Sequence, residues 1–473
     1  MTMIALIVGI FYILGILSAV HAVMSTRTPQ GAIAWSVSLM TFPFIAVPAY
    51  WILGRNKFQG YVIARKQEIE RIASVSQRAE NELAEIAAVV DTQRATVLGA
   101  ERLARLPATR GNCVELLVDG KATFSSILAG IGVAEKYVLV QFYIVHDDGI
   151  GRELKAKLIA RAKEGVQVHF LYDEMGSADL PKSYLDDLRK AGVEIFPFNT
   201  RKGKGNRFQI NFRNHRKIVV VDGRVAWVGG HNVGDEYLGK DPKIGHWRDT
   251  HVRIEGPAAI AVQLSFVEDW HWATDKVPSD LNWDPYMPDE GQTQSLIIPS
   301  GPADELETAA LMYTLAVNSA QKRIWIASPY FVPDEGIIAA LQLAALRGLD
   351  VRILIPDKSD NLMVDLAVYS FFDIVSETGV KFYRYTDGFL HAKSALIDDT
   401  VAMIGTANFD NRSMRLNFEI TAVLVDQNFI PDVEKMFEND FANARLMQTG
   451  EYDKKPYWFR FLARVFRLAS PVL

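Results

Sequence analysis

The chain has 473 residues, of which 49% are hydrophobic, and this is enough for two ordinary domains with a large buried core. Its 51 basic and 56 acidic residues give a formal net charge of −5, which argues against a protein whose main task is to bind a nucleic-acid backbone. The single cysteine, Cys113, excludes an intrachain disulfide framework and a cysteine-based zinc site.

Two apolar stretches open the chain, "MTMIALIVGIFYILGILSAVHAVM" and "GAIAWSVSLMTFPFIAVPAYWILG", and their only ionisable acidic or basic side chain is His21. Each is long enough to span a bilayer core. A cleaved signal peptide is the alternative for the first, but its start lacks the expected Lys or Arg and a second stretch follows almost at once. We therefore predict an N-terminal transmembrane helical hairpin over residues 1–54, although Pro43 and Pro48 favour a kink or a shallow re-entrant passage in the second stretch.

Basic residues around these stretches predict the orientation in the membrane. The connecting loop carries only Arg27, whereas a basic cluster follows the second stretch. The members of this cluster are Arg55, Lys57, Arg65, Lys66 and Arg71. The excess of positive charge near the cytoplasmic ends of spans places both chain ends, and the large soluble part, on the cytoplasmic side.

Residues 55–107 are expected to form a linker with an exposed amphipathic helix, because apolar residues recur among charges at helical spacing. These residues are Ile69, Ile72, Leu83, Ile86 and Val89.

An internal duplication follows. The stretch "YVLVQFYIVHDDGIGRELKAKLIARAKEGVQVHFLYDE" is similar to "RIWIASPYFVPDEGIIAALQLAALRGLDVRILIPDK". Both predict a buried strand, a "Y-x-V-x-D-[DE]-G" turn, a helix, a glycine and another strand. This alternation predicts an α/β fold of two tandem halves, residues 108–285 and 286–445, with a largely parallel sheet and a pseudo-two-fold relationship.

Each half carries the same eight-residue pattern, "HRKIVVVD" from His215 to Asp222 and "HAKSALID" from His391 to Asp398. The histidine and the lysine, Lys217 or Lys393, are two residues apart before a β-rich run, so both side chains leave the same face of a strand and can meet one ligand. Asp222 and Asp398 complete the candidate catalytic set. They lie at turns, and we expect them to support the loop by hydrogen bonding and not to touch substrate.

Beyond each pattern, "GGHN" and "GTAN" place Asn232 and Asn408 in equivalent positions, each after a glycine that allows close backbone approach. Paired histidines, lysines and asparagines around one tetrahedral anion would make a phosphoryl site. One imidazole can attack phosphorus while the other protonates the leaving alkoxide. The lysines and asparagines would hold the nonbridging oxygens, so we expect no metal and no cofactor.

A nucleophilic histidine needs its far ring nitrogen held by a carboxylate or a carbonyl. The candidates are Asp249 and Glu419, each opening a predicted strand about thirty residues beyond the histidine of its own half. Ordinary strand-start salt bridges are the alternative. His246, His251 and His271 lack metal-ligand spacing and are interpreted as structural or surface residues.

The segments "NHRKIVVVDGRVAWVGGHN" and "HAKSALIDDTVAMIGTAN" resemble the paired His-x-Lys-x4-Asp signatures of the phospholipase D superfamily. The N-terminal "RTPQGAIAWSVSLMTFPFIAVPAYWILGR", "NFRNHRK" and "GGHNVGDEY" resemble bacterial cardiolipin synthases. The resemblance implies two phospholipase-D-like halves in a bacterial inner-membrane protein that makes cardiolipin and glycerol from two phosphatidylglycerol molecules through a phosphohistidine. It also implies that His215 is the nucleophile and His391 the acid and base. Gly230 and Thr406 stand where many superfamily members have serine, which weakens any role for a hydroxyl there.

Two other functions stay open. Water can accept the group from a phosphohistidine, which would make the protein a hydrolase of phospholipid or nucleic acid, although the acidic balance counts against nucleic acid. A membrane scaffold that binds lipid without turnover is disfavoured because all the candidate catalytic side chains are present. The basic lead-in "RKGKGNRFQINFRNHRK" can face anionic headgroups, and a homo-oligomer is open.

The chain ends in a predicted basic amphipathic tail, residues 446–473. In "WFRFLARVFRLASPVL", Arg460, Arg464 and Arg467 share one helical face. This pattern suits a helix in an anionic membrane surface, and a terminal helix packed on the core is the alternative.

Overall fold

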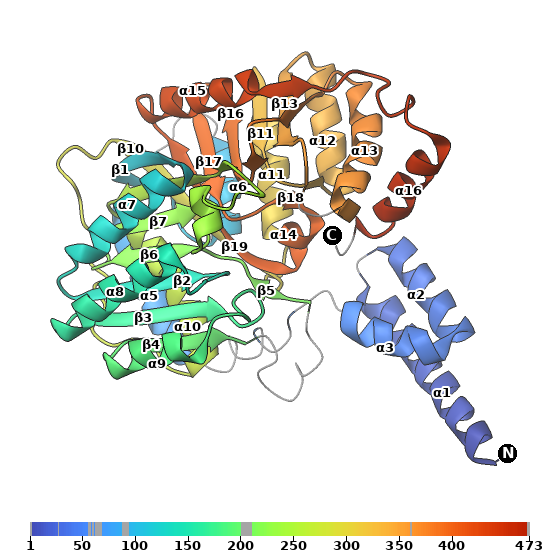
Figure 1. Ribbon diagram of the computed structural model, residues 1–473, viewed down its shortest axis with the longest axis horizontal. Helices are drawn as coiled ribbons and strands as arrows, with labels where there is room; N and C mark the ends of the chain where they lie inside the picture. Colours follow the sequence, from blue (N-terminus) through green and yellow to red (C-terminus); the bar gives the residue numbers. More distant parts are fainter. Residues whose placement is uncertain are drawn as a thin grey trace.

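One sheet of 16 strands joins both halves in the computed structural model, which describes residues 2–26, 28–54, 58, 61, 69–87, 94–199, 211–359 and 362–470. Its two central strands, β1 (Thr109–Val118) and β10 (Thr293–Ser300), pair antiparallel. Outward from β1 the order is β9-β7-β6-β2-β3-β4, and outward from β10 it is β19-β17-β16-β11-β13-β14. The same order on both sides gives the predicted tandem α/β halves a pseudo-two-fold axis between β1 and β10 (Figure 1).

The strands of the first half are β2 (Tyr137–Phe142), β3 (Gln167–Asp173), β4 (Glu194–Phe198), β6 (Ile218–Val221), β7 (Val225–Gly229) and β9 (Thr250–Glu255). Those of the second half are β11 (Arg323–Ala327), β13 (Asp350–Pro356), β14 (Lys381–Tyr385), β16 (Ser394–Ile397), β17 (Val401–Gly405) and β19 (Asn417–Val425), with β20 (Ala444–Leu446) at the edge. Along the main path of the sheet, the parallel pairings of the described residues are those within β2-β3-β4 and within β11-β13-β14. The prediction of a largely parallel sheet is therefore wrong. Tight turns join β6 to β7 and β16 to β17, and hairpins of this kind make their strands antiparallel.

Corresponding helices follow corresponding strands in the two halves, as the labels of Figure 1 show. The first half has α7 (Asp119–Gly132), α8 (Gly149–Lys163), α9 (Lys182–Lys190) and α10 (Ala258–Thr274). The second has α11 (Thr308–Ser319), α12 (Glu335–Leu346), α13 (Leu362–Ser376), the short α14 (Asn411–Arg415) and α15 (Phe429–Ala442). The repeated turn begins α8 and α12, since Asp148 caps the first through Gly151 N and Asp334 caps the second through Ile337 N.

The N-terminal region differs from the predicted hairpin. α1 (Thr2–Ser25) is the one helix among the described residues, over Met3–Ser25, that is long and apolar enough to cross a membrane. The second apolar stretch is divided into α2 (Pro29–Thr41) and α3 (Pro43–Leu53). At about 1.5 Å per residue these helices are shorter than a bilayer core of about 30 Å.

Phe42 separates α2 from α3, and Pro43 takes the first position of α3, where its missing N–H costs nothing. Both short helices pack on α1 through one apolar cluster. A hairpin of two spanning helices is thus not confirmed, and Arg27, Arg55, Lys57, Arg65 and Lys66, on which the predicted orientation depends, lie outside the described residues.

The predicted linker contains α5 (Ile69–Glu85) and α6 (Arg94–Ala104), and both lie on the α/β body. α5 packs on α10 with Ala79 and Leu83 fully buried, and α6 packs on α11 and β10. The apolar face of the linker helix is therefore covered by the body and not exposed; Val89 and the side chains of Ile69 and Ile72 lie outside the described part. At the other end, α16 (Tyr457–Arg467) packs on α13.

Candidate active site

Two short parallel pairings, of two residues each, connect the halves. β5 (Arg213–Asn214) pairs in parallel with the start of β19, and β15 (Phe389–Leu390) pairs in parallel with β8 (Trp247–Arg248). In each pair one strand leads into a His-x-Lys signature and the other leads into a candidate carboxylate of the opposite half. The pseudo-two-fold arrangement thus brings the two signatures to the junction of the halves.

Backbone hydrogen bonds hold each histidine at this junction. The amide of His215 donates to the carbonyl of Phe418 at 2.9 Å, and the amide of His391 donates to the carbonyl of Arg248 at 2.7 Å. Phe418 and Arg248 directly precede Glu419 and Asp249, so the position of each histidine is fixed against the strand that carries the other half's carboxylate.

The side chains repeat this exchange. Both Oε1 and Oε2 of Glu419 lie 3.0 Å from Nδ1 of His215, and Oδ2 of Asp249 lies 2.7 Å from Nδ1 of His391. The imidazoles are 10% exposed and the carboxylates 0% exposed. Both predicted carboxylates do contact a histidine. The sequence predicted that each carboxylate holds the histidine of its own half. In the structure each carboxylate bonds the histidine of the other half.

Burial sets the protonation of the imidazoles. It lowers the pKa of His215 to about 4 and that of His391 to about 3, although the carboxylates oppose the shift. Both rings are therefore neutral at neutral pH in the protein alone. Because a carboxylate accepts from Nδ1–H, the lone pair of each neutral ring is on Nε2.

The two lysines lie on the same face as their histidines. Lys217 Nζ donates to the carbonyl of His215 at 2.6 Å, and burial lowers the pKa of Lys217 to about 7. Lys393 Nζ donates to the carbonyl of His391 and lies 2.8 Å from its Nδ1. Because Nδ1 of His391 donates its one hydrogen to Asp249, it does not accept a hydrogen bond from Lys393. The ammonium group of Lys393 therefore acts on the histidine–carboxylate pair through its charge. Although burial favours the neutral acid, Lys393 and the neighbouring imidazoles hold the pKa of Asp249 below its usual value.

Glu419 is held by three further donors from its own half. Thr406 Oγ1 donates to Oε2 at 2.6 Å, Ser413 Oγ to Oε1 at 2.8 Å and Asn417 Nδ2 to Oε1 at 3.2 Å. Burial would raise the pKa of Glu419, but His215 and these contacts lower it below its usual value. The hydroxyl of Thr406 therefore does make a contact, although the presence of threonine where many superfamily members have serine had weakened that expectation.

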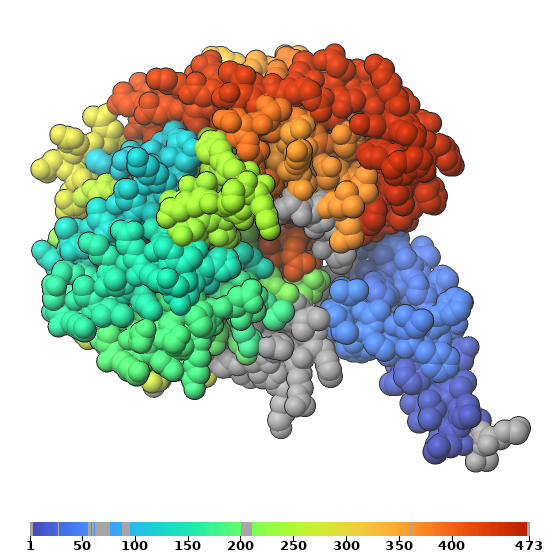
Figure 2. Space-filling model, viewed as in Figure 1, coloured from blue at the N-terminus to red at the C-terminus, as the bar shows by residue number. Residues whose placement is uncertain are grey.

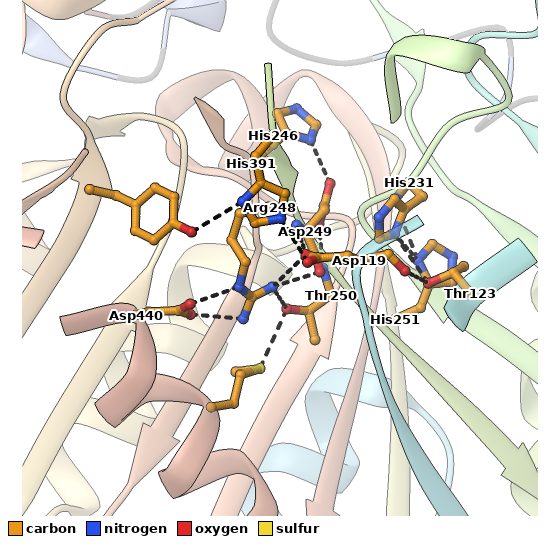
Figure 3. A network of polar contacts seen from close by, with 12 residues as sticks. Asp119, Thr123, His231, His246, Arg248, Asp249, Thr250, His251, His391 and Asp440 are labelled. Atoms are coloured by element: carbon orange, nitrogen blue, oxygen red, sulfur yellow. Dashed lines mark hydrogen bonds and ion pairs between the residues drawn. The ribbon is translucent and has the colours of Figure 1, made fainter. Parts of the chain in front are cut away.

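The equivalent position near Asp249 is Gly230, and it cannot carry a side chain. A Cβ there would lie 2.0 Å from Asp249 Oδ1. Figure 3 shows what surrounds Asp249 instead, including the buried imidazoles of His231 and His251, whose Nδ1 atoms are 3.1 Å apart. Asp249, the shorter of the two carboxylate side chains, is therefore next to glycine, whereas the longer Glu419 is next to Thr406.

A buried ion pair also crosses the junction here. Arg248 donates from Nε and Nη2 to the carboxylate of Asp440 on α15, at 2.8 and 2.7 Å (Figure 3). Such a bidentate pair fixes the strand that precedes Asp249 to the second half.

The aspartates of the signatures lie at the opposite ends of β6 and β16. Asp222 accepts hydrogen bonds from the amides of residues 135–137, and Asp398 from those of residues 321–323. Their φ values are 54° and 53°, a left-handed conformation that Asp tolerates. Seven residues of strand at about 3.3 Å each put them about 20 Å from their histidines. They belong to the scaffold, and grouping them with the catalytic residues is corrected accordingly.

The two asparagines follow β7 and β17, beyond the glycines that end these strands. Asn232 accepts from the amide of Ile144 through Oδ1 at 3.2 Å. Among the described residues, the buried Oδ1 of Asn408 has no hydrogen-bond partner.

Aromatic rings beside the histidines were missed by the sequence reasoning. Tyr143 lies edge-on to His215 with ring centroids 5.0 Å apart, and Trp247 lies 5.0 Å from His391. Tyr143 is the tyrosine of the repeated turn, a signal that had been used only to find the turn. No pattern marks Trp247, which comes to the site through the two-residue strand β8.

The three histidines that were interpreted as structural or surface residues lie outside the paired signatures. His251 and His271 are buried, while His246 is partly exposed and pairs with Asp119 at 2.8 Å. Across the part of the chain that is described, no group of three or more His, Cys, Asp or Glu side chains could hold a metal ion. Residues 201–210 of the basic lead-in lie outside the described ranges.

Comparison with known proteins identifies the family of the chain. The family described as "Cardiolipin synthase, PLD-like domain" matches residues 127–263 and 313–441, one segment in each half. Cardiolipin synthase A of Pseudomonas entomophila (strain L48) is 48% identical over 472 residues, covering 99% of this chain and 98% of that protein. Cardiolipin synthase A of Pseudomonas putida (strain GB-1) is 47% identical with the same coverage.

A solved structure supports the fold. The phosphatidylserine synthase of Haemophilus influenzae Rd KW20 superposes with a TM-score of 0.60, covering 80% of this chain and 100% of that one, at 17% identity. From the matched segments and the full-length similarity, the chain belongs to the bacterial cardiolipin synthase family of the phospholipase D superfamily.

Proposed function

We propose that this protein synthesises cardiolipin by transferring the phosphatidyl group of one phosphatidylglycerol to the headgroup hydroxyl of a second, with release of glycerol. The observation that carries the proposal is the crossed pairing of two signature histidines with two buried carboxylates, in a chain 48% identical to a cardiolipin synthase A.

The first step breaks the bond between phosphorus and the glycerol headgroup of the donor. Nε2 of His215 attacks phosphorus with its lone pair, and His391 gives the proton of its Nε2 to the departing glycerol oxygen. The enzyme then carries a phosphatidyl group on His215, and glycerol leaves.

The second step reverses these roles. Nε2 of His391, now neutral, takes the proton of the acceptor hydroxyl as that oxygen attacks phosphorus. The bond between phosphorus and His215 breaks, and cardiolipin is released. Glu419 and Asp249 keep the Nδ1 hydrogens in place throughout, so that each Nε2 returns to its starting state.

Binding of the donor must bring one proton into the site. Burial keeps both imidazoles neutral at neutral pH, yet the first step needs one protonated ring. The negative charge of a lipid phosphate raises the pKa of nearby His391 and Lys217, and this favours the protonated ring that the first step needs. We assign Lys217, Lys393, Asn232 and Asn408 to the nonbridging oxygens of the phosphate.

We further propose that α1 crosses the bacterial inner membrane, with α2 and α3 as a re-entrant pair and the α/β halves on the cytoplasmic side. The break at Phe42 supports the re-entrant arrangement, and the basic residues after the second apolar stretch support the orientation.

The test uses purified full-length protein in detergent with phosphatidylglycerol as the only lipid, and follows cardiolipin, phosphatidic acid and glycerol together. Equal amounts of cardiolipin and glycerol, lost in both His215→Ala and His391→Ala, are expected. Phosphatidic acid in place of cardiolipin would make the protein a hydrolase, and binding of the lipid without any turnover would make it a scaffold.

A further inference from the structure

The C-terminal helix α16 has an exposed apolar face that the rest of the structure does not cover. The side chains on this face are Tyr457 (77% exposed), Trp458 (62%), Phe461 (57%), Val465 (39%) and Leu468 (81%). Steps of three and four residues from 458 through 461 and 465 to 468 place them along one side of a helix. Five large apolar residues in one stripe are more than scattered surface exposure explains.

A different face of α16 already attaches the helix to the body. Ala463 is fully buried, Phe459 packs edge-on to Tyr369 of α13 with centroids 5.2 Å apart, and Phe466 packs against the main core. The exposed stripe is therefore not needed to hold α16 in place, and it is available for a second contact.

Arginines line one side of the exposed stripe. Arg464 is exposed, Arg460 lies 3.4 Å from the exposed Asp453, and Arg467 lies over the ring of Phe371. A stripe of aromatic and aliphatic side chains bordered by arginines has the chemistry of a helix at the boundary between acyl chains and anionic headgroups, where Trp and Tyr are favoured.

The rest of the chain places this stripe near a bilayer. Figures 1 and 2 show α16 on the same side of the molecule as α1, α2 and α3, at the far side from α9. Because α1 can cross a membrane, the body that follows it is held within reach of the lipid surface.

We propose that α16 lies in the interface of an anionic bilayer, with the stripe from Tyr457 to Leu468 inserted among the lipids and Arg464 at the headgroups. It forms a second membrane contact, in addition to the spanning helix α1, and fixes the orientation of the body on the surface. The proposal depends on α1 as a membrane anchor and not on which reaction the active site performs.

The test labels one position at a time in the full-length chain reconstituted into vesicles. Cys113→Ser removes the native thiol, and Phe461→Cys carries a polarity-sensitive fluorophore. The matched control is Lys190→Cys on exposed α9, and Val465→Cys gives a second reporter in case Phe461→Cys disturbs the helix. Vesicles of phosphatidylcholine are compared with vesicles that also contain phosphatidylglycerol, each with and without lipids brominated near the headgroup.

The label on α16 is expected to shift to shorter wavelength and to be quenched by brominated lipid, more strongly when phosphatidylglycerol is present, whereas the label at residue 190 stays in water. Arg464→Gln should reduce the difference between the two lipid compositions. Equal behaviour of the labels at 461, 465 and 190 would overturn the proposal. A shift of the α16 labels to shorter wavelength that grows with the ratio of protein to lipid, without quenching by brominated lipid, would overturn the proposal. It would show that the stripe contacts a second copy of the chain.

Discussion

Asp249 and His391 come from opposite halves of the chain, yet Oδ2 of Asp249 lies 2.7 Å from Nδ1 of His391. Glu419 and His215 repeat the relationship in the other direction. Neither half therefore contains a histidine together with the carboxylate that orients it. Each half therefore depends on the other for a complete histidine–carboxylate pair, and the two-residue strands β5, β8 and β15 hold the halves in this register.

Removing the charge of either carboxylate should reduce catalysis strongly while the fold is kept. In Asp249→Asn and Glu419→Gln the side chain keeps its size, but an amide no longer fixes the Nδ1 hydrogen of the histidine. We expect kcat to fall by about 100-fold or more. The measurement is cardiolipin formation at saturating phosphatidylglycerol, with Glu255→Gln, at the far end of strand β9, as the matched control. Activity within threefold of wild type in either variant would contradict the assigned role.

Gly230 and Thr406 occupy equivalent positions and should respond very differently to alanine. A methyl group at residue 230 would meet Asp249 Oδ1 at 2.0 Å, so Gly230→Ala must displace the carboxylate from His391. Thr406→Ala removes only one of the donors to Glu419. We expect a loss of about 100-fold or more for Gly230→Ala and of only about tenfold for Thr406→Ala, because a hydrogen bond to a charged group contributes about 1.5 kcal/mol at the lower end of its range. Ser413 and Asn417 still donate to Glu419 when the Thr406 hydroxyl is gone. Equal losses would show that the space at Gly230 is unimportant.

Asp222→Asn should lower stability and spare the chemistry. Asn also tolerates the left-handed conformation at this position, so the substitution isolates the charge that accepts from the amides of residues 135–137. We expect unfolding to become easier by about 1–3 kcal/mol and kcat per folded molecule to stay near wild type. Thermal unfolding and kcat are measured on the same preparation, and Asp398→Asn should behave in the same way. An unchanged melting temperature with a lost kcat would move Asp222 into the catalytic group.

The buried imidazoles of the two signatures should make the protein less stable in mild acid. Their folded-state pKa values, about 4 for His215 and about 3 for His391, lie below the ordinary value of 6.5. Between about pH 6.5 and pH 4 the unfolded chain therefore binds more protons than the folded one, and stability falls as the pH falls. Lys217, with a pKa of about 7, acts in a separate window above that value, where stability rises with pH.

The pH dependence is measured as the thermal midpoint of the detergent-solubilised protein from pH 7 to pH 4. His391→Gln should flatten the curve in part, because one depressed group is gone while His231 and His251, whose pKa values burial also lowers, remain. A curve as steep as that of the wild type would mean that other groups cause the acid sensitivity.

The candidate site residues and the duplication could be predicted because they rest on local spacing. The spacing of two positions from His215 to Lys217 puts both on one face of a strand, and the repeated turn and strand patterns locate both halves. The exchange of Asp249 and Glu419 between halves could not be predicted, since chain order puts each carboxylate after its own histidine. It depends on strands of two residues, which are too short to show any periodicity.

The second apolar stretch has the break that Pro43 favours, but its apolar composition did not show that the stretch forms two short helices. Its composition alone is compatible with a spanning helix, but Pro43 follows Phe42, and the residue before a proline is disfavoured in helical conformation. A single residue thus decides between one long helix and two short ones. The summed hydropathy of the stretch does not depend on this residue's effect on the backbone. The parallel-sheet prediction failed because the βα alternation covers only the outer strands of each half.

The crossed pairing is tested most directly by nuclear magnetic resonance of protein labelled with ¹⁵N in its histidines. The imidazole signals of His215 and His391 are assigned by substitution and followed against pH in wild type, Asp249→Asn and Glu419→Gln. The structure predicts that Asp249→Asn changes the Nδ1 signal and the titration of His391 and leaves those of His215 unchanged, while Glu419→Gln does the reverse. A change at His215 upon Asp249→Asn, with His391 unaffected, would contradict the shared site.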